Sequence, residues 1–203
     1  FDRLASGVRA IRVPAHGRCT VQKANHAALC ETADAAREVG LQSISYLAVD
    51  TASTAFDHDG APHSELGLDA EEVEMLAAEV ERLIVAEPSF VRESPEKLRG
   101  IVRRFRARLG QAAPQAPPCT APWVSAVVET DGTLRPCFFH EPVGNVREQG
   151  LLGALNSDKA IRFREGLDVG ADPVCRNCVC SLNRPFVRPG SKDAVATTRD
   201  AAS

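Results

Sequence analysis

The sequence lacks the features of a membrane or nucleic-acid-binding protein. No apolar run approaches the roughly 20 residues that a membrane-spanning helix needs. The formal net charge of -3 argues against nonspecific binding of nucleic acid, which requires a basic surface. No stretch has the charged, apolar and small-residue order of an export signal. We therefore expect a cytoplasmic protein with neither a membrane nor a nucleic acid as its partner.

Cysteine is the residue type whose number and pattern are informative. The 203 residues include seven cysteines, five of which lie between Cys119 and Cys180. An odd number without an export signal fits a reducing compartment and metal ligation better than a set of disulfides. The other two, Cys19 and Cys30, are expected to fill the hydrophobic core, for which 44% apolar content is sufficient. Because the first residue is Phe rather than Met, we expect the chain to begin inside a longer protein.

A predicted β-hairpin brings two of the cysteines together. The residues 124–129 and 133–137 have the pattern of short strands around a turn at Asp131-Gly132. Cys119 precedes the first strand and Cys137 ends the second. An antiparallel hairpin would therefore place both thiols at the same end.

A second pair of cysteines, Cys175 and Cys178, has the two-residue spacing with which a turn offers two thiolates to one ion. Four thiolates are the ligand set of structural zinc and also of a [4Fe–4S] cluster. Cys180 is a further candidate, either as a substitute for Cys178 or as a free thiol nearby. His140 is a potential ligand too, for which we favour a role beside the ligands or on the surface.

The spacing of these residues resembles a known family. Cys119-x12-Gly132-x4-Cys137, followed by Gly144-Asn145 and the late Cys-x2-Cys, resembles the C-terminal extension of radical S-adenosylmethionine (SAM) enzymes called SPASM or, in its shorter form, Twitch. Full SPASM domains hold two auxiliary [4Fe–4S] clusters and continue as Cys-x2-Cys-x5-Cys-x3-Cys. Here Arg184 stands where the next cysteine would be, and no cysteine follows Cys180. The resemblance thus implies a single cluster, as in Twitch.

The first part of the chain has the pattern of a β-α-β unit. A short helix near the N-terminus is followed by predicted strands at 20–24 and 43–49. The helix between them is predicted to start at the N-cap Asn25 and to end at Gly40. Strand, helix and strand within so short a segment favour parallel pairing of the two strands.

The resemblance implies that residues 1–60 are the C-terminal piece of a partial (β/α) radical SAM barrel. Lys23 and Asn25 would then lie near the nucleoside of SAM, and the acidic loop 50–59 would face the substrate. A helix cap is the alternative role for Asn25. For His58, in that loop, a solvated histidine is favoured over a catalytic one.

Two amphipathic helices are predicted next. The first begins at a capping box formed by Asp69 and Glu72, and the second at Ser94-Pro95. Seven acidic residues against one basic occupy 69–87, and seven basic against two acidic occupy 92–108. One interpretation is that the two helices pair as a hairpin. Another is that the basic face of the second helix binds an acidic substrate or partner. Solvated faces are favoured, because exposed ion pairs contribute only about 0–1 kcal/mol each.

The predicted fold is therefore α/β and consists of four parts. Residues 1–60 are the barrel remnant, 61–116 a helical connection with a Pro-rich linker, 117–184 a small α+β Twitch-like domain, and 185–203 a disordered tail. In the Twitch-like part, helices from about Leu151 and from Ser157 are expected to cover the hairpin.

One absence bears directly on activity. Radical SAM enzymes cleave SAM at a cluster held by Cys-x3-Cys-x2-Cys, and no such triplet occurs here. The resemblance implies the C-terminal part of such an enzyme, inactive alone, with SAM and a second [4Fe–4S] cluster bound by a missing N-terminal barrel half. The auxiliary cluster would position a peptide or small-molecule substrate, or accept an electron. A stand-alone four-cysteine zinc-binding interaction module and an electron carrier without SAM are the alternatives.

Overall fold

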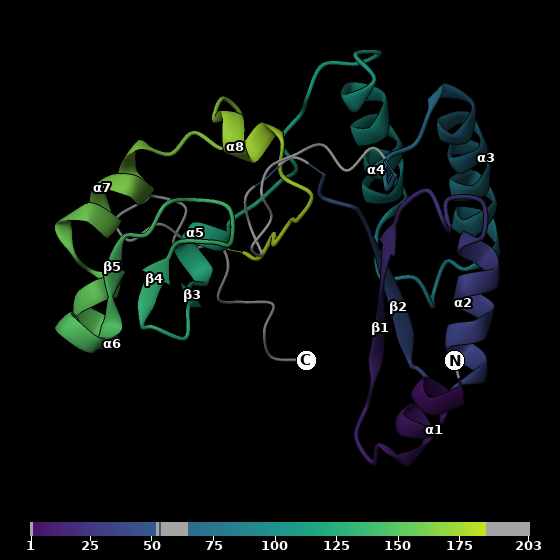
Figure 1. Cartoon of the computed structure of the whole chain (residues 1–203), viewed down its shortest axis with the longest axis horizontal. Helices are drawn as coiled ribbons and strands as arrows, with labels where there is room; N and C mark the ends of the chain where they lie inside the picture. The colour runs from purple at the N-terminus through teal and green to yellow at the C-terminus, as the bar shows by residue number, and fades with distance from the viewer. Residues whose placement is uncertain (1, 52, 54–64, 186–203) are drawn as a thin grey trace, which may run out of the picture. The chain divides into compact units, whose positions relative to one another are not determined.

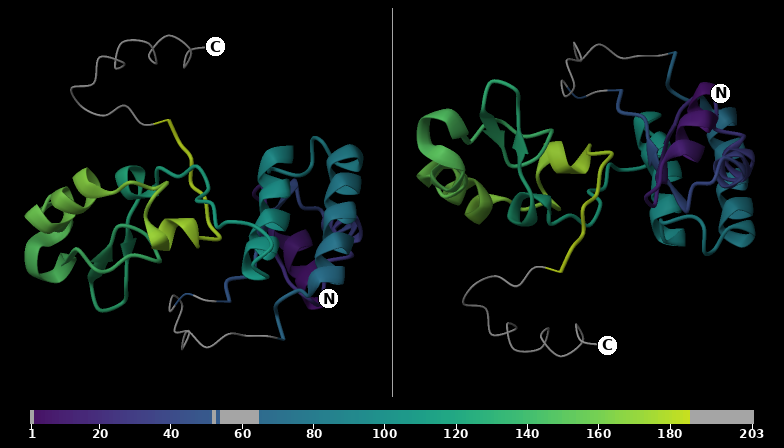
Figure 2. Two further views of the ribbon diagram at one scale, coloured as in Figure 1. Left: turned by 90° about the horizontal axis from the view of Figure 1, so that it is seen from above. Right: turned by 90° about the horizontal axis from the view of Figure 1, so that it is seen from below.

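The computed structural model describes residues 2–51, 53 and 65–185, and Figure 1 shows the helices and strands in this part of the chain. The chain divides into two compact units. The first unit reaches Gln115 and includes Asn177–Cys180, whereas the second comprises Ala116–Arg176 and continues from Ser181. Figure 2 gives two further views of the same elements. The predicted loop residue His58 and the predicted tail after Pro185 lie outside the described residues.

The first unit contains a parallel two-stranded sheet. Its elements up to the sheet are α1 (Asp2–Ala10), β1 (His16–Val21), α2 (Leu29–Glu38) and β2 (Ser43–Ala48). β1 and β2 pair in parallel from His16↔Ser43 to Val21↔Ala48, which confirms the predicted parallel pair. The strand predicted at 20–24 was placed too late, because the chain turns directly after Val21, where the N–H of Asn25 donates to the Gln22 carbonyl.

The segment after the third helix extends this sheet on one side. Ile44 donates its N–H to the Phe90 carbonyl, and the Arg92 N–H donates to the Ile44 carbonyl, at 3.1 and 2.9 Å. Val91 and Ile44 form a parallel bridge. The outer edge of β2 is thus partly hydrogen-bonded, which protects it from pairing with another chain.

The two long helices are α3 (Ala70–Ala86) and α4 (Pro95–Arg108). Both predicted starts are confirmed: Asp69 and Glu72 form a capping box, and the Ser94 hydroxyl accepts from a first-turn N–H. Arg99 on α4 donates to both carboxylate oxygens of Glu81 on α3 at 2.7 Å. The two helices therefore pair as a hairpin, one of the alternatives considered, and the charged faces are also solvated, because the side chains of Arg99 and Glu81 are 49% and 55% exposed.

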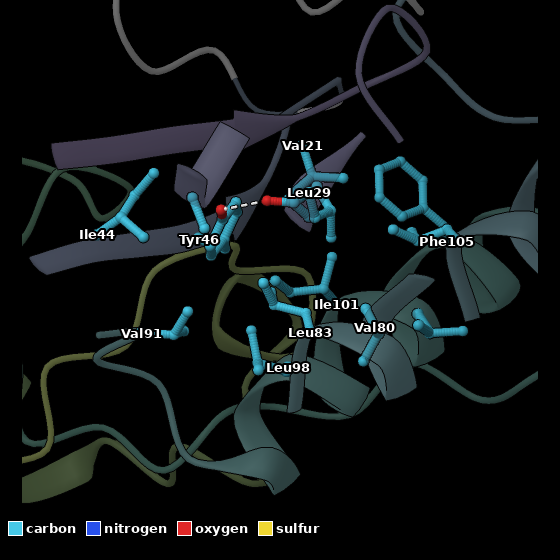
Figure 3. Close-up of a cluster of buried hydrophobic side chains, with 14 of the residues drawn as sticks. Val21, Leu29, Ile44, Tyr46, Val80, Leu83, Val91, Leu98, Ile101 and Phe105 are labelled. Carbon is cyan, nitrogen blue, oxygen red and sulfur yellow. Dashed lines mark hydrogen bonds between the residues drawn. The ribbon is translucent and has the colours of Figure 1, made fainter. Parts of the chain in front are cut away.

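One hydrophobic core joins the sheet to α2, α3 and α4 (Figure 3). The fully buried side chains include Leu29 of α2 and Leu83 of α3, and Leu98 of α4 is 2% exposed. The Tyr46 hydroxyl on β2 donates to the Leu29 carbonyl at 2.8 Å. Cys19 and Cys30 pack against this core, which confirms their predicted place. α3 and α4 therefore belong to the body of this unit.

The second unit is a small antiparallel sheet with helices. Its elements are α5 (Ala121–Val124), β3 (Val127–Val128), β4 (Thr133–Arg135), β5 (Gly144–Asn145), α6 (Val146–Leu155), α7 (Asp158–Gly166) and α8 (Pro173–Arg176). The strand order is β3-β4-β5 and both pairings are antiparallel, which confirms the predicted hairpin. The strand predicted at 124–129 is shorter, because residues 121–124 form a helical turn. β5 was not predicted.

The turn and caps of the second unit follow from local sequence. Gly132 has φ +89°, the left-handed conformation that favours glycine. Asn145 caps α6, which starts earlier than the predicted Leu151 and is kinked at Gly150. The Ser157 hydroxyl accepts from the N–H of Ala160, as predicted for the start of α7. The small core of this unit consists of Leu134, Val143, Ala154 and Ala160. Within the described ranges, every helix is too short or too polar to span a bilayer.

Candidate metal centre

The sulfurs of Cys119 and Cys137 each accept hydrogen bonds from the peptide chain that follows them. The Ala121 N–H donates to Cys119 Sγ at 3.5 Å. The peptide N–H groups of Phe139 and His140 donate to the sulfur of Cys137. Burial raises the pKa of Cys137, and these two N–H groups act in the opposite direction. Peptide N–H groups aimed at a sulfur favour its thiolate form, which is the form that binds metals.

The same arrangement recurs at Cys178, in the first unit. Its sulfur accepts from the N–H of Cys180 at 3.3 Å. The turn is held from α4 by Arg104, whose Nη1 donates to the Cys178 carbonyl at 2.9 Å and whose Nη2 donates to the Asn177 carbonyl. Burial lowers the pKa of Arg104 to about 10, so its guanidinium stays charged at neutral pH. Cys180 thus contributes a peptide donor to the sulfur of its neighbour.

Cys175 lies at the end of α8 beside a buried histidine. His140 is 7% exposed, and its Nε2 is 3.3 Å from Cys175 Sγ. Asp172 Oδ1 accepts the Cys175 N–H at 2.9 Å and lies 3.8 Å from the same ring nitrogen. Burial lowers the pKa of His140, and Asp172 opposes this shift. The predicted surface role for His140 was therefore wrong, whereas a role beside the ligands stays open.

The donor chemistry of these residues fits a thiolate-bound metal or cluster. Three sulfurs from separate parts of the chain accept peptide N–H groups of the residue two positions on. His140, Asp172 and Cys175 also present ligand atoms that lie within 4.8 Å of one another. Cys119, Cys137 and Cys175 belong to the second unit, and Cys178 to the first. The meeting of all four sulfurs therefore stays a prediction.

The residues predicted to lie near SAM are engaged within the first unit. Lys23 Nζ is 3.1 Å from Glu72 Oε1. Asn25 Oδ1 accepts from the Gln22 N–H at 2.8 Å, and its Nδ2 donates to the Thr20 carbonyl at 3.0 Å. The alternative role of Asn25 as a helix cap was wrong, because α2 is preceded by Ala28 and Asn25 closes the turn after β1. Contact of Lys23 and Asn25 with SAM stays a prediction.

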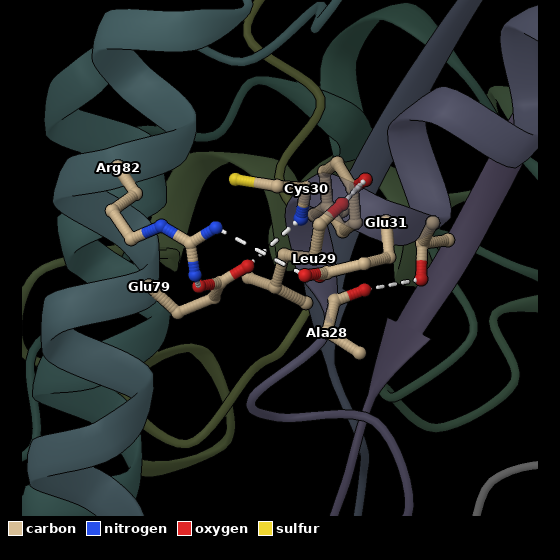
Figure 4. A network of polar contacts seen from close by, with 8 residues as sticks. Ala28, Leu29, Cys30, Glu31, Glu79 and Arg82 are labelled. Atoms are coloured by element: carbon tan, nitrogen blue, oxygen red, sulfur yellow. Dashed lines mark hydrogen bonds and ion pairs between the residues drawn. The ribbon is translucent and has the colours of Figure 1, made fainter.

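Glu79 is a buried charged residue whose role was not predicted (Figure 4). It is 3% exposed on α3, its Oε1 accepts the N–H of Cys30, and its Oε2 pairs with Arg82. Burial, with the Glu79 carboxylate as the next cause, raises the pKa of Cys30 to about 11. Cys30 is therefore a protonated thiol in the body of the first unit. The only sequence signal for this role was the place of Glu79 beside the apolar stripe of α3.

Comparison with known proteins identifies the family to which the cysteine-rich region is similar. Residues 119–179 match the family model described as SPASM, an iron-sulfur cluster-binding domain. No curated protein and no solved structure matches the chain. The match covers Cys119, Cys137, Cys175 and Cys178, and it ends one residue before Cys180. Residues 119–179 are therefore a SPASM domain, an iron–sulfur cluster-binding domain typical of radical SAM enzymes.

Proposed function

We propose that the SPASM domain binds one auxiliary [4Fe–4S] cluster through Cys119, Cys137, Cys175 and Cys178, and that the chain is the C-terminal part of a radical SAM enzyme. The observation that carries the ligand assignment is the repeated peptide N–H···S contact at Cys119, Cys137 and Cys178. Cluster sulfurs and their ligands are stabilised by such donors. The family match supports iron–sulfur chemistry rather than zinc.

Cys180 is proposed to act through its peptide N–H rather than as a ligand. Its N–H already donates to Cys178 Sγ at 3.3 Å, which orients the sulfur of the neighbouring ligand. The matched family region ends at residue 179. With Arg184 in place of a further cysteine, the chain offers thiolates for one cluster.

In the proposed enzyme, the SPASM domain holds the auxiliary cluster and the first unit lies near SAM. A bound auxiliary cluster supplies one-electron redox chemistry or an anchoring point for a substrate. Peptide N–H groups of the chain itself orient three of the sulfurs, those of Cys119, Cys137 and Cys178. Lys23 and Asn25 are proposed to lie near SAM, which would be held with the second cluster by an N-terminal barrel half. The substrate is proposed to be a peptide or a small molecule.

Anaerobic reconstitution of the purified chain with iron and sulfide tests the cluster. We expect a brown protein with about four iron atoms per chain, as for one [4Fe–4S] cluster. The single variants C119S, C137S, C175S and C178S should each lose most of the iron, whereas C180S should keep it. C30S is the matched control, because Cys30 lies against the core of the first unit.

A colourless chain that retains one tightly bound zinc ion after the same treatment would overturn the cluster assignment in favour of a structural zinc module. The radical SAM part of the proposal has its own test, which is the reading frame that encodes residues ahead of Phe1. A Cys-x3-Cys-x2-Cys triplet in that frame supports the enzyme. A frame without one would leave an electron carrier as the better function, to be examined by redox titration without SAM.

A further inference from the structure

We propose that His140 is a positioning residue for Cys175, donating a hydrogen bond from its Nε2–H to the cysteine sulfur. This bond would orient the thiolate and raise the reduction potential of the bound cluster. The effect on the reduction potential rests on the proposed function, because it requires a bound cluster. The contact between His140 and Cys175 does not depend on the proposed function. Sequence spacing does not indicate it, because the two residues are 35 positions apart.

The geometry constrains Cys175 from two sides. His140 Nε2 lies 3.3 Å from the sulfur, within the range of hydrogen bonds to sulfur, and Asp172 Oδ1 accepts the backbone N–H of Cys175 at 2.9 Å. The imidazole itself is fixed by an edge-on contact with Phe163, with ring centroids 4.9 Å apart and planes at 65°. Because His140 is also buried, its ring has little freedom to turn away from the sulfur.

The chemistry of the sulfur decides the direction of the hydrogen bond. A metal-bound thiolate carries no proton, so it can only accept. The contact is then attractive only if Nε2 carries a proton, which in a neutral ring means the Nε2–H tautomer. Hydrogen bonds to cluster sulfurs stabilise the extra negative charge that reduction adds. Loss of this donor should therefore move the reduction potential to more negative values.

The hydrogen-bond donor of His140 can be removed by mutation, whereas the donors at the other three sulfurs cannot. Cys119, Cys137 and Cys178 accept from peptide N–H groups, which a side-chain substitution leaves in place. The donor that His140 directs at Cys175 belongs to a side chain, so it can be removed or conserved at will. This allows a donor-keeping and a donor-free variant to be compared at one position.

Potentiometric titration of the reconstituted full chain, followed by electron paramagnetic resonance, tests the proposal. We expect H140L to show a more negative midpoint potential than the unsubstituted chain, and H140Q, which keeps an N–H donor, to lie near it. H16L is the matched control, because His16 is an exposed histidine on β1. Equal potentials in H140L and the unsubstituted chain, or a directly coordinated nitrogen in pulsed spectra, would overturn the proposal.

A readout without iron separates this proposal from the cluster assignment. A four-thiolate site also suits zinc, which is diamagnetic, so the ¹⁵N-labelled full chain can be loaded with zinc. Nuclear magnetic resonance should then show the Nε2–H tautomer of His140. A Nδ1–H tautomer or a zinc-bound Nε2 would contradict it. If H140L fails to fold, the tautomer still decides the question. If no cluster assembles at all, the proposed function fails while the tautomer remains measurable.

Discussion

The carboxylate of Glu79 on α3 accepts a hydrogen bond from the backbone N–H of Cys30, at the first turn of α2, over a distance of 2.9 Å. The residue that precedes α2 is Ala28, which provides no side-chain cap. Helix N-termini leave N–H groups without intrahelical partners, and a negative charge there is favourable. A side chain 49 residues along the sequence therefore performs the capping that the local sequence omits.

We predict that Glu79→Ala lowers the free energy of unfolding by about 1–3 kcal/mol, the range for a buried group left without its partner. Glu79→Gln should have a smaller effect, because its amide oxygen can still accept from Cys30. Urea unfolding followed by circular dichroism measures both. The control is Glu74→Ala, which removes an exposed pair with Arg106 and should change stability by less than about 1 kcal/mol. Equal losses for Glu79→Ala and Glu74→Ala would contradict the capping role.

Glu93 should make the stability of the first unit depend on pH. Burial raises the pKa of its carboxyl group, although the Tyr46 N–H, which donates to it at 2.9 Å, opposes the shift. A pKa that is higher in the folded state means that the unfolded chain releases this proton first. The protonated Glu93 carboxyl group therefore contributes to the free energy of unfolding in full below the ordinary glutamate pKa of about 4.3. This contribution is lost as the pH rises through the raised pKa of the folded state.

We expect Glu93→Gln to remove this loss of stability with rising pH. The stability of the variant relative to the unsubstituted chain should therefore increase as the pH rises from the ordinary pKa of glutamate to the raised pKa of Glu93. Urea midpoints measured in steps between about pH 4 and pH 7, a range that brackets the ordinary glutamate pKa, test the prediction. Glu96→Gln, at an exposed position three residues on, is the control. Parallel pH profiles for Glu93→Gln and the unsubstituted chain would show that the carboxyl group titrates normally.

Gly132 should be the glycine of the second unit that tolerates substitution least. It has φ +89°, and an added Cβ would lie 2.7 Å from Asn145 Oδ1. That oxygen caps α6 by accepting the N–H of Arg147. The conformation alone disfavours alanine by about 1–2 kcal/mol, and displacement of the cap should add about 1 kcal/mol.

Gly150→Ala is the matched comparison for Gly132→Ala. Gly150 has a similar φ of +69°, but an added Cβ there meets nothing within 4 Å. We therefore expect a smaller loss for Gly150→Ala. Chemical unfolding monitored by the fluorescence of Trp123, the single tryptophan of the chain, reports on this unit. If Gly150→Ala lowers the free energy of unfolding as much as Gly132→Ala does, the positive φ alone explains the effect and the contact with Asn145 adds nothing.

Arg104 is predicted to stabilise the turn that presents Cys178. Its guanidinium donates to the carbonyls of Asn177 and Cys178, and hydrogen bonds from charged groups contribute about 1.5–3 kcal/mol each. Because about 1.4 kcal/mol corresponds to a tenfold change in an equilibrium, Arg104→Met should speed hydrogen exchange in 177–180 by roughly tenfold or more. Mass spectrometry of peptides measures this in the metal-free chain. Arg103→Met, at an exposed neighbouring position, should leave the exchange unchanged.

Features that depend on near neighbours in the chain could be predicted from the sequence. The capping box of Asp69 and Glu72, the hydroxyl caps of Ser94 and Ser157, and the turn at Gly132 are confirmed. Each joins groups no more than a few residues apart, so residue type and spacing are sufficient. The cysteine spacing indicated the SPASM domain for the same reason, since a family motif is a pattern along the chain.

Errors in the predicted elements arose where local patterns compete with packing. The strand at 20–24 looked favourable from its residue types, but hydrogen bonds to β2 select His16–Val21 instead. Asn25 has the chemistry of a helix cap, yet its amide closes the preceding turn. For the strand, a partner outside the local window decided the bounds. For Asn25, the partners Gln22 and Thr20 lie only three and five residues before it, so residue type alone did not select between a turn and a helix cap.

The sequence by itself determined the thiol spacing, the amphipathic helices and the hairpin, because all of these are set by covalent order and local conformation. Only the tertiary structure decided that Glu79 caps α2, that Arg104 holds the turn at Cys178, and that His140 contacts the sulfur of Cys175. Each of these contacts joins residues that are 35 or more positions apart. Such partners become neighbours only after the elements pack, so burial and geometry, rather than spacing, select them.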